Sequence, residues 1–345
     1  MPVWWIYPVA GAFVLSVVLT DVLIYFSKRF NFLDRPTKER KRHEGAVPLL
    51  GGVGIFLAFS IITIIVLIAS DHFTSGEITN WHFVGLLLGG LILIIGGVLD
   101  DKFDLPPKLS IIFPILAALA AVVFGIGVSK ITNPFGNAFD IPDVVSSIFT
   151  FVWLMGMIYT TKLLDGLDGL ATGVTSIGAL MIALLALTTV YFQPDVALLS
   201  LIAFAALIGF LLWNFHPAHI FLGESGSTFV GYLIGSLAII SGSKVATALL
   251  VLGIPALDVL FVIIERWRNG KPIFAIGDRR HLHHRLFDLG LNQRQVIALY
   301  YIIALAFGVT TLIFESWQKL IALAVLFIIM LTLALYFSQR KKKVI

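Results

Sequence analysis

Long apolar runs separated by short polar segments make up most of the chain. A run of roughly 18 or more apolar residues is long enough to cross a bilayer as a helix. Eleven candidate spans follow this pattern, near residues 3–26, 49–70, 82–99, 109–128, 146–164, 170–192, 195–213, 228–241, 245–264, 295–313 and 319–337. The pattern predicts an all-α polytopic membrane protein with about eleven transmembrane helices, the eighth being short.

The composition agrees with a membrane class. Of the 345 residues, 59% are hydrophobic and 13% are charged, and the mean hydropathy is +0.98, far outside the range of soluble domains. The first run has no basic residue before Lys28 and is too long for the apolar part of a signal peptide, so we expect a retained span. Cysteine is absent, which excludes disulfides and thiolate metal sites. Without an internal repeat, we expect one membrane domain over 1–345 with a basic tail over 338–345.

Lysine and arginine determine the predicted orientation. With the N-terminus outside, only Lys130, Lys244 and Lys319 of the 24 Lys and Arg residues fall in outer segments. Cytoplasmic segments carry an excess of these residues in membrane proteins. We therefore expect a multi-pass protein of the inner (plasma) membrane, with an odd number of spans, a cytoplasmic C-terminus and its chemistry on the cytoplasmic face.

The first two polar inner segments carry opposite charges. "LDRPTKERKRHEGAVPLLGG" contains Arg40 and His43, and is compatible with a plain basic loop or with phosphate binding. "GGVLDDKFDLPPK" contains Asp100 and Asp101, followed by Lys108. Adjacent carboxylates at a membrane boundary repel each other and lose hydration, so a cation should offset them.

The third inner segment, "TTKLLDGLDGLATG", carries Lys162, Asp165 and Asp168 at three-residue spacing. If a helix continues through the segment, these side chains share one face. The two Asp-Gly steps are equally compatible with a break after Leu164. A local Lys-Asp pair that caps a span would leave Asp168 without a role.

The fourth segment, "WNFHPAHIFLGESGSTFVG", places Glu224 between Gly223 and Ser225, just before a span. Small residues let backbone amides approach an anion, and a helix that begins at Ser227 would direct its positive end there. A plain N-cap is the alternative.

The fifth segment, "RWRNGKPIFAIGDRRHLHHRLFDLG", gathers histidines and arginines. Its histidines lack partner ligands at metal spacing, and the neighbouring arginines would repel a cation. Such a cluster suits a pyrophosphate better. Carboxylates and an Arg/His cluster on one membrane face together indicate Mg²⁺ with a phosphorylated substrate, and a lipidic partner would explain the many spans.

These stretches carry a family resemblance. In order, "DRPTKERKRHEGAVPLLGG", "GGVLDDKFDLPPK", "LLDGLDGLATG", "NFHPAHIFLGESGSTFVG" and "GDRRHLHHRLFDLG" resemble the polyprenyl-phosphate N-acetylhexosamine-1-phosphate transferases. The "HLHHRL" loop and the eleven spans are more similar to the WecA/TagO-like branch than to the MraY branch of that superfamily. The resemblance covers nearly the whole chain.

The resemblance implies an activity and a site. The family transfers a sugar 1-phosphate from a UDP-sugar to undecaprenyl phosphate, releases UMP, requires Mg²⁺, for which Mn²⁺ is an alternative, and starts cell-envelope glycan synthesis. By matching position, the resemblance implies that Asp100, Asp101 and Asp168 are catalytic and that Glu224 and Asp168 are metal ligands. It also implies that the substrate is bound by Arg40, His43, Lys108, Lys162, Asp165, Asn214, His281, His283, His284 and Arg285. A homodimer is compatible with the resemblance, and no nucleic-acid partner is expected.

Three positions in two of the motifs depart from the family pattern. The family usually has aspartate in "GDxGS", where this chain has Glu224, and two asparagines before "DGLDG", where it has Tyr159 and Lys162. A protonated lysine has only hydrogen-bond donors and cannot hold a metal. We therefore expect Lys162 to bind a substrate phosphate.

Two other classes compete with this interpretation. "DDKFD" satisfies the DDxxD motif of UbiA-like prenyltransferases, but Asp165 and Asp168 are three residues apart where that class has a four-residue spacing. A transporter or lipid-binding protein would place its charges near the membrane midplane. Only Asp21 and Asp258 lie well inside spans, and Asp258 is near an inner end where it could face the site.

Overall fold

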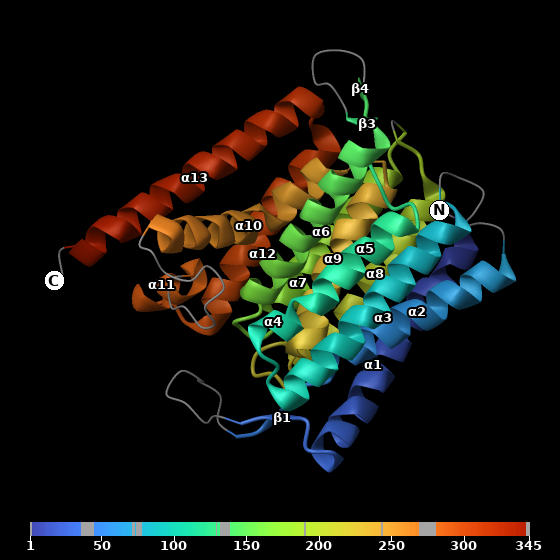
Figure 1. Ribbon diagram of the computed structural model, residues 1–345, viewed down its shortest axis with the longest axis horizontal. Coiled ribbons are helices and arrows are strands. Elements are labelled where there is room, and N and C mark those ends of the chain that lie inside the picture. Colours follow the sequence, from blue (N-terminus) through green and yellow to red (C-terminus); the bar gives the residue numbers. More distant parts are fainter. Residues whose placement is uncertain are drawn as a thin grey trace.

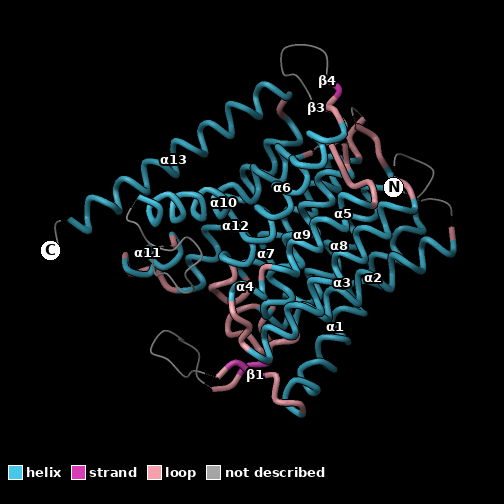
Figure 2. The backbone as a smooth tube through the Cα atoms, in the orientation of Figure 1, coloured by secondary structure: helices cyan, strands magenta, loops and turns pink. Residues whose placement is uncertain are grey.

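The computed structural model is almost entirely helical. It describes residues 2–35, 45–70, 73, 78–128, 130–131, 139–189, 191–242, 244–268 and 281–342. The long helices are α1 (Ile6–Arg29), α2 (Gly51–Ala69), α3 (Asn80–Phe103), α5 (Ile112–Val123), α6 (Asp143–Leu164), α7 (Leu170–Ala186), α8 (Pro194–Asn214), α9 (Gly223–Ile240), α10 (Val245–Arg268), α12 (Gln293–Ile313) and α13 (Ser316–Lys342). Short elements are the 3-10 turn Val3–Trp5, α4 (Pro107–Ser110), α11 (Leu282–Asp288) and the antiparallel pairs β1 (Leu33–Asp34) with β2 (Val47–Pro48) and β3 (Lys130–Ile131) with β4 (Phe139–Asp140) (Figure 2).

The all-α membrane class is confirmed. Each of the eleven predicted runs coincides with one of the long helices. Among the described residues, eight helices are long and apolar enough to span a bilayer, whereas α7 and the stretch Pro107–Val123 are shorter. The helix α9 has 18 residues and begins with the polar sequence "GESGST". Eight candidate spans are thus established, and a total of eleven stays a prediction.

Helix α9 is the centre of the bundle (Figure 1). It contacts α3, α6, α2 and α7, and every one of its residues except Glu224 is buried. Helices α1 and α13 lie at the periphery and expose apolar side chains such as Val14 and Ile328, as expected for lipid-facing helices. Figure 1 shows α10 and α13 extending away from the main bundle, toward the C-terminus. The bundle therefore holds Glu224 at the tip of a completely enclosed helix.

Glycines allow α9 to approach its neighbours closely. A Cβ atom added to Gly97 of α3 would overlap the backbone of Ser225, and one added to Gly52 of α2 would overlap the backbone of Gly226. In membranes, small residues let helices pack backbone to backbone, because lipid tails provide no hydrophobic force between helices. This packing brings the ends of α2, α3 and α9 together.

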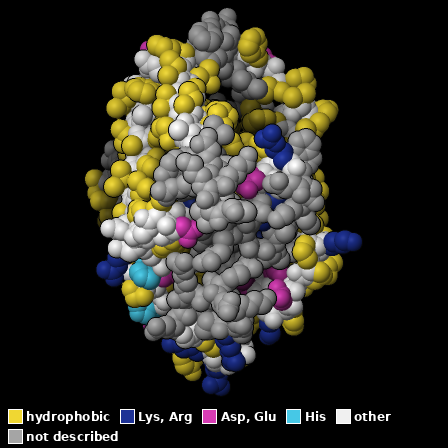
Figure 3. All heavy atoms as spheres, turned by 90° about the vertical axis from the view of Figure 1, so that its left-hand side faces the viewer, with side chains coloured by type: hydrophobic (Ala, Val, Ile, Leu, Met, Phe, Trp, Pro, Cys, Tyr) yellow, Lys and Arg dark blue, Asp and Glu magenta, His cyan; other side chains and the backbone are white. Residues whose placement is uncertain are grey.

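The polar segments gather at one end of the bundle. Backbone hydrogen bonds join the first segment to the fourth, where Phe221 N–H donates to Pro48 O (2.8 Å) and Gly51 N–H donates to Phe221 O (3.1 Å). The β3–β4 pair lies at the opposite end (Figure 1). In the side view, hydrophobic side chains cover much of the upper surface and Lys and Arg side chains gather at the lower end (Figure 3). This segregation agrees with the charge pattern, and the assignment of the polar end to the cytoplasm stays a prediction.

The close approach of α3 and α9 predicts that no side chain larger than that of glycine is tolerated at position 97 without loss of stability. We expect Gly97→Ala to lower the free energy of unfolding by about 1–3 kcal/mol, because overpacking displaces backbone that cannot yield. Gly156→Ala is the matched control, since nothing lies within 4 Å of its added Cβ and alanine favours helix. Thermal unfolding in detergent should separate the two variants. Equal stability of both would contradict the close packing.

Candidate active site

Asp101 caps the buried start of α9. Its two carboxylate oxygens accept the Glu224 N–H at 2.9 and 3.1 Å. Gly223 adopts φ +71° there, and an added Cβ would collide with the Asp101 carboxylate and with Leu49 O. The first N–H groups of a helix lack intrahelical partners, and a carboxylate there also faces the positive end of the helix dipole. Asp101 thus fixes the start of α9 against the end of α3.

Asp100 organises the turn that follows α3. One of its oxygens accepts the Leu105 N–H and the other accepts the Ser110 hydroxyl, each at 2.8 Å. A narrow cavity beside Glu224 is lined by residues of α3, α5 and α9 and by Ser110 of α4. Asp100 and Asp101, two of the three residues predicted to be catalytic, therefore lie at the polar end, near Glu224.

Lys162 pairs with Glu224. Its ammonium forms an ion pair with Glu224 Oε1, with the two side chains 25% and 21% exposed, and lies 5.7 Å from the centre of the Tyr159 ring. Lys162 and Glu224, two of the three residues that depart from the family pattern, are thus partners, contributed by α6 and α9. A partly buried ion pair is costly to break from one side, because the remaining charge is left without compensation.

Asp165 lies in the turn between α6 and α7. Helix α6 ends at Leu164, so the break at the Asp-Gly steps is confirmed and the continuous helix is excluded. Burial of the Asp165 carboxyl, with repulsion from Glu224 and Asp168, raises its pKa to about 8. This group therefore favours the protonated form unless a cation compensates its charge.

Asp168 faces a different partner. Its Oδ2 lies 2.7 Å from Nδ1 of His216 and accepts the Ala218 N–H at 3.2 Å. Asp168 is thus bound to the segment before α9. A shared metal contact of Asp168 with Glu224 stays a prediction, whereas Asp165 and Glu224 are close enough to repel each other.

Asn214 joins the third and fourth segments. Its Oδ1 accepts the Gly169 N–H (3.1 Å) and the Thr172 hydroxyl (2.8 Å), and its Nδ2 donates to Ile220 O (3.0 Å). The residue is 2% exposed. These bonds support a structural role, and its predicted contact with substrate stays a prediction.

The remaining predicted site residues include one that is exposed, two that pair with residues of α10, and others that lie outside the described part of the chain. Lys108 is exposed on α4. His281 is buried and bonded to Asp258 (2.8 Å), and Arg285 forms an ion pair with Glu265 (3.4 Å). Arg40 and His43 lie outside the described residues, as do the side chains of His283 and His284.

The donor set is compatible in kind with a magnesium ion. Asp100, Asp101 and Asp165 all interact electrostatically with Glu224, and carboxylate oxygens are the ligands that Mg²⁺ prefers. Within the described part of the chain, however, no three Asp, Glu, His or Cys side chains are arranged as metal ligands. The Lys162 ammonium contacts the Glu224 carboxylate instead. The cluster thus has carboxylates in excess over its ammonium group, and Glu224 would have to exchange this partner to bind a metal.

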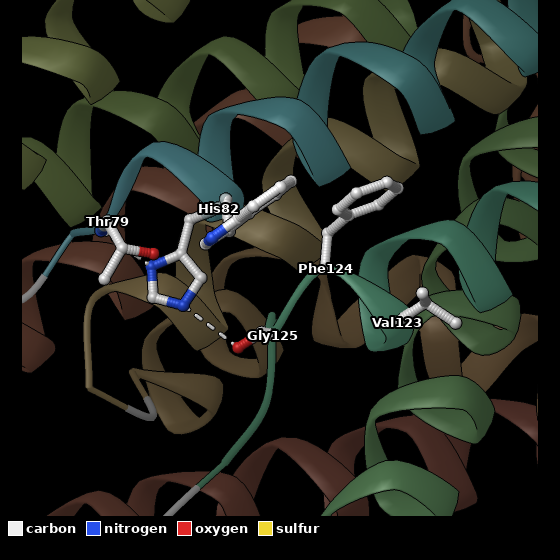
Figure 4. A pocket seen from close by; sticks show the side chains of 6 residues that line it. Thr79, His82, Val123, Phe124 and Gly125 are labelled. Carbon is white, nitrogen blue, oxygen red and sulfur yellow. Dashed lines mark hydrogen bonds between the residues drawn. The ribbon is translucent and has the colours of Figure 1, made fainter.

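A shallow pocket at the other end of α3 lacks such chemistry. It measures about 410 Å³ and is lined by Thr79, Trp81, His82, Val123, Phe124 and Gly125, and His82 Nε2 lies 3.0 Å from Gly125 O (Figure 4). His82 and Asp101 are 19 residues apart on one helix, a separation of roughly 28 Å at 1.5 Å per residue. The acidic cluster is therefore the candidate active site.

Comparisons with known proteins identify the family of the chain. A family model described as Glycosyl transferase family 4 matches residues 83–242, which include Asp100, Lys162 and Glu224. The chain is 31% identical over 331 residues to a probable undecaprenyl-phosphate N-acetylglucosaminyl 1-phosphate transferase of Bacillus subtilis (strain 168), covering 93% of this chain and 88% of the relative. The chain belongs to the polyprenyl-phosphate N-acetylhexosamine-1-phosphate transferase family.

Two further relatives have the same kind of name. An undecaprenyl-phosphate alpha-N-acetylglucosaminyl 1-phosphate transferase of Thermotoga maritima is 33% identical over 272 residues, covering 79% of this chain and 78% of the relative. A decaprenyl-phosphate N-acetylglucosaminephosphotransferase of Mycolicibacterium smegmatis is 29% identical over 355 residues, covering 94% and 86%. This transferase is therefore an enzyme embedded in a membrane.

Sequence patterns missed two residues of the candidate active site. His216 lies within the fourth motif but has no spacing that marks it as the partner of Asp168. Tyr301 of α12 donates to Gly169 O at 2.5 Å and supports the turn after Asp168. Both contacts join elements far apart along the chain, so no local pattern signals them.

The raised pKa of Asp165 predicts a pH-dependent stability. Because the folded state holds this proton up to about pH 8 and the unfolded state releases it near pH 4, stability should fall as the pH rises between these values. Asp165→Asn cannot ionise, so its melting temperature should exceed that of the parent by a margin that grows from pH 4 to pH 8. Calorimetry in EDTA-containing detergent buffer measures this margin. A constant margin would show that folding does not raise the pKa of Asp165.

Proposed function

We propose that this transferase moves N-acetylglucosamine 1-phosphate, or the 1-phosphate of a related N-acetylhexosamine, from a UDP-sugar to polyprenyl phosphate. An oxygen of the lipid phosphate attacks the phosphorus next to the sugar, the bond to the other phosphate breaks, and UMP leaves. The observation that carries this proposal is the acidic cluster around the Lys162–Glu224 ion pair, at the polar end of a bundle of apolar helices. The names of the relatives favour the same reaction.

The reaction needs positioning and charge compensation more than covalent chemistry. An ionised phosphate monoester is already a nucleophile, so the protein has to align two anions and reduce their repulsion. Lys162 supplies a positive charge at the centre of the cluster. The ammonium would exchange Glu224 for a donor phosphate, a contact that also removes negative charge from the reacting group.

A magnesium ion would complete the charge balance. Glu224, together with Asp165 or Asp168, would hold it. When bound, the ion would share phosphate oxygens and stabilise the charge that develops during transfer. The Glu224 carboxylate would thus always be paired with a cation. This cation would be Lys162 before the substrate binds and the metal ion afterwards.

The two alternative classes have distinct products. A UbiA-like prenyltransferase would release pyrophosphate, and a transporter would move a solute without a covalent product. The family membership favours neither class. Product analysis therefore separates all three.

The primary test of the proposed function is product release. Purified protein with Mg²⁺, undecaprenyl phosphate and UDP-N-acetylglucosamine should release UMP and form a lipid-linked sugar diphosphate, and EDTA should abolish both. Glu224→Ala should lower kcat about a hundredfold or more, in line with the loss of one charge-stabilising group at an active site. Absence of UMP across a panel of UDP-sugars would overturn the proposal.

The position of Lys162 in the ion pair with Glu224 predicts that its loss impairs the reaction, whereas loss of a nearby exposed lysine does not. Lys162→Ala should raise the donor KM or lower kcat, because a cation close to the donor phosphates is lost, and it should also leave Glu224 without compensation. Lys102→Ala is the matched control, since Lys102 is an exposed lysine in the last turn of α3. Steady-state UMP release measures both variants. Kinetics unchanged from the parent in Lys162→Ala would assign Lys162 a structural role.

A further inference from the structure

A carboxylate within the α10 span holds the first turn of α11. Asp258 Oδ2 lies 2.8 Å from His281 Nδ1, and Oδ1 accepts the Leu282 N–H at 2.9 Å. The two side chains are 13% and 8% exposed. A carboxylate at this depth is costly unless it is paired and hydrogen-bonded. Both of its oxygens are directed to one place, the start of α11.

The contact supplies a cap that α11 lacks by itself. His281 is the N-cap residue, and its side chain makes no capping bond to its own helix. The Leu282 N–H is one of the first amides that have no intrahelical acceptor, and an oxygen from α10 satisfies it. Asp258 therefore acts as an N-cap contributed by a different helix.

A second contact aligns α11 along α10. Arg285 Nη2 lies 3.4 Å from Glu265 Oε2. His281 and Arg285 are four residues apart, and Asp258 and Glu265 are seven apart, so each pair occupies one face of its helix. Figure 1 shows α11 beside the outer part of α10. The first contact is short and buried and the second is longer and more exposed, so Asp258 contributes the stronger constraint.

We infer that Asp258 and His281 form a positioning pair that places α11, and that His281 acts through Asp258 and not on the substrate. The inference rests on the proposed function only in that α11 carries His283, His284 and Arg285, the residues predicted to contact the donor. It differs from the expectation that His281 itself binds the donor. Neither residue is a catalytic residue in this arrangement.

Two substitutions of His281 separate these roles. The Asn side-chain amide lies where Nδ1 of histidine lies and can still donate to Asp258, whereas the longer Gln amide reaches the place of Nε2. With a positioning role, His281→Asn keeps activity close to that of the parent, and His281→Gln behaves like His281→Ala. If His281 bound the donor through Nε2, the order of Asn and Gln would be reversed, which would overturn the inference.

Coupling between the partners provides a second readout. Loss of a residue that orients a metal ligand typically lowers activity about 10–100-fold, and by analogy Asp258→Ala and His281→Ala should each lower kcat/KM for UMP release by about this factor. The double variant should be no worse than either single variant, because both remove the same constraint. Additive losses would contradict a shared role. Asp21→Asn, which changes the acid inside α1, is the matched control and should retain activity.

Hydrogen exchange tests the pair without any assay of activity. Exchange of the α11 amides in the full chain should rise in Asp258→Ala and His281→Ala, but not in His281→Asn or Asp21→Asn. If the parent releases no UMP and this exchange pattern is nevertheless found, the proposed function fails and the positioning pair stands. If UMP is released and α11 exchange is unchanged in Asp258→Ala, the positioning pair fails and the proposed function stands.

Discussion

The hydrogen bonds from the Glu224 N–H to Asp101 are the interaction on which the site depends. Helix α9 is enclosed on all sides, so its first N–H groups have little access to water and need partners within the protein. Asp101, at the end of α3, supplies one such partner. Because Gly97 and Gly52 leave no space between the helices, this cap holds Glu224 in one place. The ion pair with Lys162 follows from that placement.

The carboxylates differ in the partner that offsets their negative charge, and this difference determines where chemistry can occur. Asp101 faces a helix start, Asp168 faces His216, and Asp258 faces His281. Glu224 pairs with Lys162, and Asp165, whose charge is repelled by Glu224 and Asp168, has no ion-pair partner among those found in the described part of the chain. The cation that accompanies a phosphorylated substrate would offset the excess negative charge at Glu224 and Asp165. The other acidic residues mainly hold segments of the chain together.

Two of the three departures from the family pattern, Lys162 and Glu224, have a single explanation in the structure. A lysine in place of asparagine and a glutamate in place of aspartate would each disturb an acidic site if introduced alone. Together they form an ion pair between α6 and α9, and the longer glutamate side chain provides reach toward the ammonium. The pair keeps the net charge of the site closer to neutral than a carboxylate cluster without a lysine would be.

The sequence by itself determined the helices and the end at which the polar segments gather. Apolar length and the Lys/Arg distribution are local properties, and a bilayer enforces both. Tertiary structure decided the partners: Lys162 with Glu224, Asp168 with His216, and Asp258 with His281. Local spacing suggested Lys162 with Asp165, but α6 ends at Leu164 and the nearest opposite charge comes from α9. Such contacts depend on how closely the helices pack. Glycines at particular positions permit this close packing, and no periodic pattern along the chain encodes it.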